Sequence, residues 1–285
     1  MDKYHRGEGR DGMGAHMLQA REGSVRPGPV QGHRRVVSRA LRARTVPRTS
    51  LCAARRQKML ELMQCCYDGV EPARFFADLE AKHVVILLYN HGTQELVGFS
   101  TMRVEEEQVQ GQRVELIFSG DTVIHPDYWG QKTLQAAFGR FILSRKLRHP
   151  FRPCLWLLLS KGVKTYLLMV NHFPQSFPQP GKTMPPAYKM LCDRLARTWW
   201  PDAYDAARGV LHFVPQRDCV KPHLGTLDVN PDTQILPQVA FFLAQNPGYS
   251  RGDEFVCLAK LRVVDLLRAL IRIAWRKGRL LVRGG

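Results

Sequence analysis

Apolar residues change spacing several times between about residue 55 and residue 175, and each spacing predicts one element. The first set recurs every three or four positions, as on one face of a helix, at Met59, Leu62, Met63 and Cys66. A second helix is predicted at 72–82, where Pro72 suits the first turn. Strands are predicted at 83–89, 95–104 and 113–124, separated by turn signals at Asn90-His91-Gly92 and Gln110-Gly111. The three strands are therefore expected to form an antiparallel meander.

A strand–helix–strand unit extends this meander. Residues 133–147 place apolar side chains on one helical face, and the apolar run 154–159 is typical of a strand buried on both faces. A further helix is predicted at 162–171. The fold class is therefore α/β, with a mixed, mostly antiparallel sheet flanked by helices. Later elements are weaker: a helix at 188–199 and strands at 209–214 and 254–259.

Charge is concentrated at the two ends of the 285-residue chain, whose net charge is +17. Residues 1–58 hold 14 Lys and Arg against 4 Asp and Glu, and residues 260–285 hold 8 against 1, so the remainder is neutral. We expect a disordered basic extension at 1–54, a globular domain at 55–259 and a basic amphipathic helix at 260–285. A neutral body makes nucleic acid an unlikely partner of the domain itself, although basic tails that grip phosphate remain one alternative.

Seven cysteines, scattered and odd in number, fit reduced thiols in a cytoplasmic protein better than a disulfide framework. No histidine or cysteine set has metal-ligand spacing, so no metal is predicted. No apolar run is long enough for a transmembrane helix. Nucleotide-binding glycine loops and a serine nucleophile elbow are absent from the sequence.

The third strand of the meander runs directly into a turn and then a helix. Helix N-termini bind anions, because the first four N–H groups have no intrahelical partner. The turn begins with Ile124-His125-Pro126 and continues through the segment 129–134, Trp-Gly-Gln-Lys-Thr-Leu. The sequence therefore predicts a phosphate-binding turn at this strand end.

The element order and this turn resemble the GNAT acyltransferase superfamily over roughly residues 55–175. In that superfamily an apolar-x-Pro step ends the fourth strand, and an (Arg/Gln)-x-x-Gly-x-(Gly/Ala) loop then holds the pyrophosphate of coenzyme A. Here Trp129 stands at the Arg/Gln position, while Lys132 and Leu134 stand at the two glycine positions. The resemblance implies an acyl-CoA or acetyl-CoA co-substrate bound by Val123, Ile124, Trp129, Gly130, Gln131, Lys132 and Thr133.

Two carboxylates are candidates for the general base that an attacking amine requires. If side chains alternate along the strand, Glu115 and Asp121 point the same way together with Ser119. Glu115 also lies in Val-Glu-Leu-Ile-Phe, similar to the Ala-Glu-Ile-(apolar)-Phe of the histone-modifying branch, where the glutamate is the base. The alternatives are that Glu115 is a solvated residue at the strand start and that Asp121 caps the turn.

The helix after the fifth strand of the superfamily often carries a tyrosine that faces the leaving sulfur. Tyr166 lies nearest to that position and is the candidate general acid; its alternative is an aromatic ring packed on the sheet. Lys161 and Lys164 open the same helix, where they could reach a phosphate or an anionic acceptor.

The C-terminal helix is predicted to be amphipathic, with a polar stripe of Asp265, Arg268, Arg272, Arg276 and Arg279. Apolar residues and a tryptophan fill the rest, a pattern typical of helices that lie in a membrane interface; the alternative is docking on the domain or on a partner subunit. We therefore expect anionic membrane contact through 260–285, peripheral to the inner membrane face.

The predicted function is an N-acyltransferase that moves an acyl group from acyl-CoA to a small-molecule or lipid-like amine acceptor. Acyl carrier protein is an alternative donor, because an acidic carrier would complement the basic ends and altered pyrophosphate loops occur in such enzymes. The competing hypothesis is a catalytically inactive GNAT-like protein that binds a ligand or partner.

Overall fold

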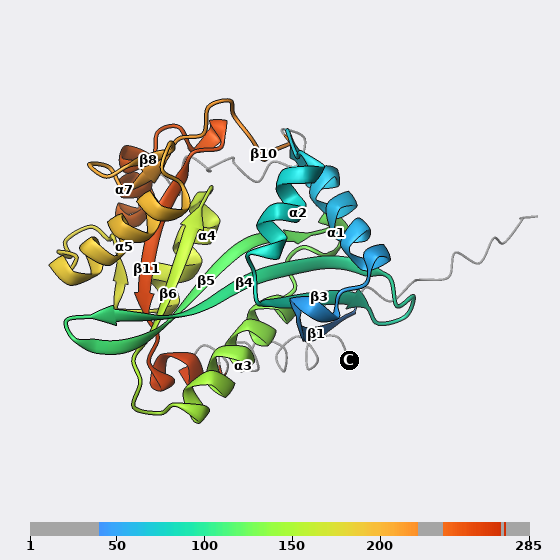
Figure 1. Cartoon of the computed structure of the whole chain (residues 1–285), viewed down its shortest axis with the longest axis horizontal. Helices are drawn as coiled ribbons and strands as arrows, with labels where there is room; N and C mark the ends of the chain where they lie inside the picture. The colour runs from blue at the N-terminus through green and yellow to red at the C-terminus, as the bar shows by residue number, and fades with distance from the viewer. Residues whose placement is uncertain (1–39, 222–235, 269–270, 272–285) are drawn as a thin grey trace, which may run out of the picture. The chain divides into compact units, whose positions relative to one another are not determined.

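The computed structural model describes residues 40–221, 236–268 and 271. One large sheet runs through this part of the chain in the order β1-β3-β4-β5-β6-β11-β9-β8 (Figure 1). Its strands are β1 (Leu41–Pro47), β3 (Val84–Asn90), β4 (Leu96–Val109), β5 (Gln112–Ile124), β6 (Cys154–Ser160), β8 (Tyr204–Asp205), β9 (Val210–Leu211) and β11 (Glu254–Lys260), with β7 (Ser176–Phe177) paired to β11. A small second sheet pairs β2 (Tyr67–Asp68) with β10 (Cys219–Val220).

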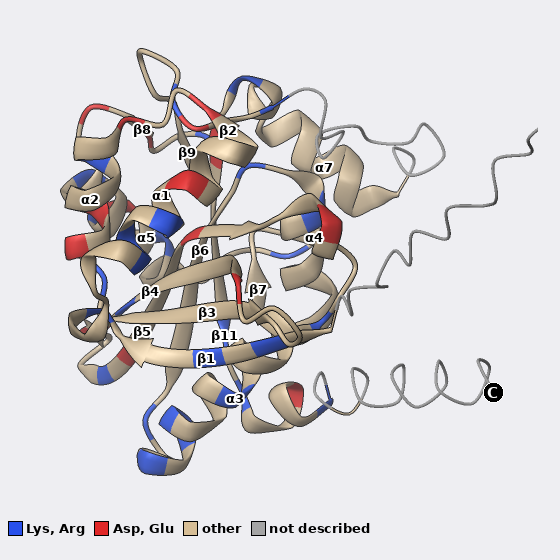
Figure 2. Cartoon of the chain, turned by 90° about the vertical axis from the view of Figure 1, so that its right-hand side faces the viewer, with Lys and Arg blue, Asp and Glu red and all other residues tan. Residues whose placement is uncertain are grey.

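Helices cover both faces of the large sheet. The helices are α1 (Ala53–Cys66), α2 (Pro72–Glu80), α3 (Thr133–Arg148), α4 (Val163–His172), α5 (Pro186–Trp199) and α7 (Pro237–Gln245), with 3-10 turns η1 (Arg48–Ser50), η2 (Pro126–Tyr128) and η4 (Tyr249–Arg251). Side chains of α3, α4 and α7 share one apolar core with the sheet, whereas α1, α2 and α5 cover the opposite face. Figure 2 shows α4 and α7 on one side of the strands and α1, α2 and α5 on the other.

The long β4–β5 hairpin organises the sheet. Its turn residues Gln110 and Gly111 both have positive φ, at 52° and 76°, which matches the twist of two-residue hairpins. Between positions 114 and 119 every β5 side chain is buried, because helices cover both faces there. The following part of the strand is more open.

A β-bulge interrupts the hairpin where the candidate site begins. Ser100 pairs with Thr122 but Met102 pairs with Ser119, so Gly120 and Asp121 together face the single residue Thr101. The extra residue reverses the alternation of side chains along β5. Ile117 packs on the α3 side, whereas Val123 packs on the α1 side.

Beyond the bulge, β5 separates from its parallel neighbour β6. The two strands pair only from Glu115 opposite Cys154 to Ser119 opposite Leu158. β5 then continues to Ile124, while the end of β6 stays paired with β11. Because a bulge bends the strand and increases its local twist, the two strands diverge toward their carboxyl ends.

The expected mixed α/β sheet and the GNAT-like element order are confirmed, including three antiparallel strands followed by a parallel crossover. The domain boundary at residue 54 is wrong, because Leu41–Pro47 pairs along its whole length with β3. Basic residues alternate along this segment because it is an edge strand of the sheet. In composition alone, such a strand resembles a disordered basic segment. Residues 1–39 lie outside the described part. No described helix is long and apolar enough to cross a bilayer.

The C-terminal helix, described at residues 263–268 and 271, differs from the predicted stripe. Asp265 is 1% exposed and forms a bidentate ion pair with Arg262, at 2.7 and 2.9 Å. Val264, Leu267 and Ile271 are instead 43–56% exposed. Asp265 therefore does not belong to a solvated polar stripe, and apolar side chains face outward there; the other predicted members beyond Arg268 lie outside the described residues.

Glycine at position 120 allows the bulge to pack against α2. A Cβ there would lie 2.5 Å from Lys82 Cε and 2.8 Å from Thr101 Oγ1, and Lys82 is buried and ion-paired with Asp78. We expect Gly120→Ala to lower the free energy of unfolding by about 1–3 kcal/mol, as overpacked sites do. Denaturant unfolding measures this, with Gly162→Ala as control, because a Cβ at Gly162 meets nothing within 4 Å. Equal stability of the two variants would contradict the packing described.

Candidate active site

A cavity of about 770 Å³ occupies the opening between β5 and β6. Residues of both strands line it, including Gly120, Asp121 and Thr122 at the bulge and Trp156 at the base of the opening. Trp156 Nε1 donates a hydrogen bond to Ser119 Oγ at 2.9 Å, at the last paired position of the two strands. The cavity therefore begins where the strand pairing ends.

The cavity is lined from both faces of the sheet. On the α3–α4 side its wall includes Leu134, Gln135, Phe138, Thr165 and Leu168. On the opposite side it includes Asp78, Lys82, Arg103, Trp199, Trp200 and Arg217. A ligand could thus reach the strand opening from one face while a second ligand approaches from the other.

The predicted pyrophosphate turn, residues 125–133, lies between two residues that line the cavity, Ile124 and Leu134, but the turn residues are not themselves part of the lining. Trp129 Nε1 donates to the Ile124 carbonyl at 2.7 Å, which folds the indole back on the turn, and Gly130 has a φ of +83°. Lys132 is the N-cap of α3, and its side chain makes no capping hydrogen bond. The N-cap side chain therefore does not occupy the first N–H groups of α3, at the helix end that includes the cavity-lining Leu134 and Gln135.

The seven predicted cofactor-binding residues are placed differently. Ile124 lines the cavity, and Gly130, Gln131, Lys132 and Thr133 form the turn into α3. Val123 does not face the opening: the bulge turns it into the core beside Phe99 and α1, with 3% of its surface exposed.

Asp121 is the predicted catalytic residue that the structure places in the cavity. Its backbone lies at the bulge, and no described residue forms an ion pair or hydrogen bond with its carboxylate. Burial, followed by the negative charge of Asp78, raises the pKa of Asp121 to about 7, although Lys82 and Lys161 oppose the shift. A carboxyl group that titrates near neutrality can accept a proton from an amine.

Glu115 does not share a row with Asp121, because the bulge lies between them. Its carboxylate is 4% exposed and is held by Arg145 of α3, whose Nε donates to Oε1 at 2.9 Å. Glu115 is not among the residues that line the cavity. The prediction of one carboxylate row is therefore wrong, and the position of Glu115 does not support a general-base role.

Tyr166 is fully buried and also lies outside the cavity lining. Its hydroxyl donates to the Pro178 carbonyl at 3.0 Å, and its ring packs beside Phe242 and Phe255. Burial raises the pKa of its phenol. The α4 side chains that face the cavity are those of Thr165 and Leu168, so the helix is rotated relative to the predicted register. The packing alternative describes Tyr166 better than the general-acid role.

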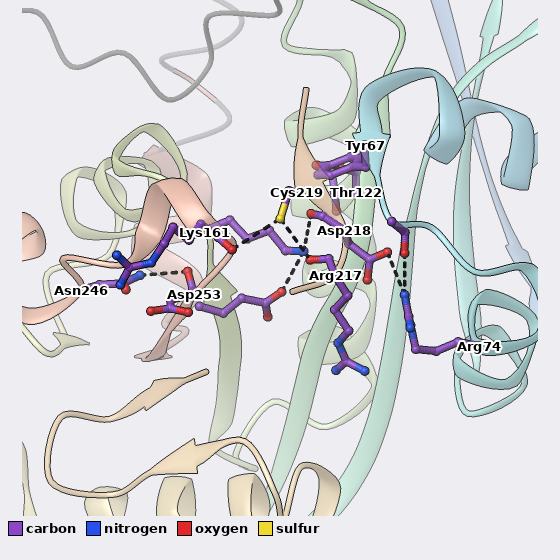
Figure 3. Close-up of polar contacts among 12 residues, drawn as sticks. Tyr67, Arg74, Thr122, Lys161, Arg217, Asp218, Cys219, Asn246 and Asp253 are labelled. Atoms are coloured by element: carbon purple, nitrogen blue, oxygen red, sulfur yellow. Dashed lines mark hydrogen bonds and ion pairs between the residues drawn. The ribbon is translucent and has the colours of Figure 1, made fainter. Parts of the chain in front are cut away.

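Ion pairs connect residues from distant segments in one part of the cavity wall (Figure 3). Lys161 contacts Glu254 Oε1 and the Asp218 carbonyl, each at 3.0 Å, and Arg74 lies 3.6 Å from Asp218 Oδ1. The chain around Asp218 is also tied to α1, since Lys221 N donates to the Cys66 carbonyl at 3.0 Å beside the β2–β10 pair. The segment 213–221 therefore bridges the two sides of the opening.

Several cavity residues were missed from the sequence. Trp199 and Trp200 end α5 and meet the Phe118 ring at centroid distances of 5.3 and 5.6 Å. Tyr67 donates from its hydroxyl to the Thr122 carbonyl at 3.5 Å, and burial raises its pKa to about 12. These side chains come from segments far apart in sequence. The adjacent pair Trp199-Trp200 at the end of α5 was the one local signal in the sequence for this part of the cavity wall.

No protein-family model matches the chain, and no curated protein matches it. Among similar solved structures is a conserved Enterococcus faecalis V583 protein described as a probable N-acyltransferase, with 13% identity, a TM-score of 0.36 and an alignment over 48% of this chain and 32% of that one. A Trypanosoma brucei acetyltransferase has 18% identity, a TM-score of 0.35 and coverage of 51% and 98%.

A third similar structure is the AtaT toxin bound to the C-terminus of the antitoxin AtaR and to acetyl-CoA, with 13% identity, a TM-score of 0.33 and coverage of 50% and 87%. Each of these solved structures aligns to about half of this chain. At such TM-scores they carry no argument about activity. The strand order, with three antiparallel strands followed by a parallel crossover, agrees with the GNAT-like element order expected from the sequence.

The Glu115–Arg145 pair predicts a stability effect that is separate from catalysis. Replacing Glu115 by Gln leaves the Arg145 charge poorly compensated, and we expect the free energy of unfolding to fall by about 3 kcal/mol, the lower end for broken buried pairs, because Arg145 is partly exposed. Thermal or denaturant unfolding measures the loss. Glu106→Gln removes a similar but exposed pair with Arg152 and serves as the control with little expected change. A fully stable Glu115→Gln protein would contradict this account.

Proposed function

We propose that the chain is an N-acyltransferase that moves an acyl group from acyl-CoA to an amine. The observation that carries this proposal is the cavity between β5 and β6, which is lined from both faces of the sheet and has Asp121 among its lining residues. A thioester arm laid between the diverging strands would meet an amine arriving from the side of α2 and α5. A GNAT-like protein without catalysis is the alternative, and the kinetic test below decides between them.

The reaction needs one proton acceptor. The amine nitrogen attacks the thioester carbonyl carbon, the carbon–sulfur bond breaks, and the thiolate leaves with the bonding electron pair. Asp121 takes the proton from the nitrogen, which its raised pKa favours. The thiolate is protonated in turn; Tyr67, a neutral phenol on the same cavity, is a candidate donor.

The donor is acyl-CoA or acetyl-CoA in this proposal. The N–H groups at the start of α3 provide partners for a diphosphate. Lys132 directly precedes this helix, and its ammonium group would add a positive charge beside the diphosphate. Apolar side chains of Leu134, Phe138 and Leu168 suit a pantetheine arm and acyl chain. Acyl carrier protein is an alternative donor, attracted by the basic ends of the chain.

Replacing Asp121 by Asn removes the base, and we expect kcat to fall about 100-fold or more, the usual contribution of general-base catalysis. In the unaltered protein kcat/KM rises with pH through about 7, because only the deprotonated carboxylate accepts a proton. This rise of kcat/KM with pH is expected to disappear in Asp121→Asn. Steady-state assays with acetyl-CoA and a panel of primary amines measure both effects.

The matched control is Asp202→Asn, an exposed carboxylate outside the cavity lining, which should leave rate and pH profile unchanged. Acetyl transfer that is equally fast in Asp121→Asn would reject Asp121 as the base. If no acyl-CoA thioester is consumed with any amine, the non-catalytic alternative is favoured.

The enzyme is further proposed to work at an anionic membrane surface, peripheral on the cytoplasmic side. Val264, Leu267 and Ile271 are exposed at the start of a segment whose residues 260–285 hold 8 basic and 1 acidic side chain. The loop after α3 also exposes Phe151, and it leads into β6, whose first residue Cys154 accepts a hydrogen bond from Leu261 N at 2.8 Å. Apolar and basic residues together favour anionic bilayers.

A triple variant, Val264→Glu, Leu267→Glu and Ile271→Glu, should lose binding to vesicles of mixed phosphatidylcholine and phosphatidylglycerol in sedimentation assays. The reason is that it removes the apolar contact and adds repulsion. Met190→Glu is the control, because Met190 is an exposed apolar residue on α5, at 71%. Equal sedimentation of all three proteins would remove the membrane proposal and leave the transferase proposal untouched.

A further inference from the structure

Charged side chains on the cavity wall pair off almost completely. The ion pairs that include them are Arg74–Asp218, Lys82–Asp78, Lys161–Glu254 and Arg103–Glu105. Two lining residues remain outside these pairs, the carboxylate of Asp121 and the guanidinium of Arg217. Within the described chain the cavity therefore offers one uncommitted negative and one uncommitted positive group.

Arg217 is held in place without using its hydrogen-bond donors. Its guanidinium carbon lies 3.6 Å from the centroid of the Phe213 ring, and no described residue accepts a hydrogen bond from the guanidinium. In Figure 3 its guanidinium end points away from Lys161 and Asp218 and carries no dashed line. Burial lowers the pKa of Arg217, which a bound anion would offset. Stacking fixes the plane of the group and leaves its edge free for an anion.

The position of Arg217 assigns it to the acceptor side. Phe213 packs with the α5 core, on the face of the sheet opposite α3 and the turn at Gly130. A diphosphate at the start of α3 would therefore be separated from Arg217 by the sheet. Arg217 and Asp121 share the same charged neighbours, since Asp78 and Asp218 affect the pKa of both.

We propose that the acceptor is an amine that also carries a carboxylate or phosphate, and that Arg217 binds this oxyanion while Asp121 faces the amine. A planar guanidinium matches two oxygens of either group with two parallel N–H donors. This inference rests on the proposed acyl transfer for the role of the amine. The oxyanion site itself depends only on the geometry of Arg217.

The remaining wall favours an apolar or aromatic substituent on the acceptor. Phe118, Trp199 and Trp200 form a contiguous cluster, with Trp199 and Trp200 rings 5.5 Å apart. Arg103 already lies 4.3 Å from the centroid of the Trp199 ring, so one cation already occupies that ring. A neutral ring fits this wall better than a second ammonium group.

The test compares amines that differ only in the oxyanion, by fluorescence titration of the full chain without any acyl donor. The probes are tryptophan against tryptamine, phenylalanine against phenethylamine, and O-phosphoethanolamine against ethanolamine. We expect an oxyanion-bearing member to bind about 10- to 100-fold more tightly than its partner, the range for hydrogen bonds to charged groups. Carboxylate and phosphate arms identify which oxyanion is preferred.

Arg217→Gln should abolish this preference, and Arg217→Lys should retain part of it because the charge remains without the planar fork. Arg208→Gln, an exposed arginine outside the cavity lining with the same change in charge, should keep it. Thermal unfolding verifies that each variant is folded. No preference in the unaltered protein, or a preference that survives in Arg217→Gln, would overturn the proposal.

The same titration separates this inference from the proposed reaction. Oxyanion-dependent binding that requires Arg217, without consumption of any acyl-CoA, would retain the binding site and reject the transferase. Acyl transfer to simple amines, at rates that depend neither on the oxyanion nor on Arg217, would retain the transferase and reject the oxyanion site.

Discussion

The bulge at Gly120 and Asp121 is the constraint on which the rest of the site depends. It inserts one residue into β5, reverses the direction of the following side chains and ends the pairing with β6. Without it, β5 and β6 could pair further, Val123 would point toward α3 and Asp121 would share a face with Glu115. The cavity exists because backbone hydrogen bonding between two central strands stops after five paired positions.

As a consequence of the bulge, one carboxylate stabilises the fold and a different one is the candidate catalytic group. Glu115, before the bulge, lies in the fully paired part of the sheet and is compensated by Arg145. Asp121, in the bulge, lies where the strands have separated, and no described residue forms an ion pair with it. Its neighbours Lys82 and Lys161 are each committed to another carboxylate, so they only moderate its charge. A single register shift thus separates a structural acid from a candidate catalytic one.

Much of the central fold could be predicted from the sequence, because β3 and β6 are continuous apolar runs and α3 repeats apolar residues at helical spacing. The edge strand β1 could not, since alternating arginines in 41–47 resemble an unstructured basic segment. The bulge also left no clear signal, so strict alternation wrongly placed Glu115 and Asp121 on one face of β5. Arg217 and the Phe118–Trp199–Trp200 wall become a site only through tertiary contacts between distant segments. The strand-to-helix turn at Pro126–Thr133 was visible locally, because it depends on neighbouring residues alone.

The most direct measurement is a crystal structure of the protein with a non-hydrolysable acyl-CoA analogue. The account predicts the pantetheine arm between β5 and β6 beyond Ser119, the diphosphate against the first N–H groups of α3, and the reactive carbon within reach of Asp121. An analogue bound elsewhere while the space between the two strands stays closed by protein side chains would contradict it.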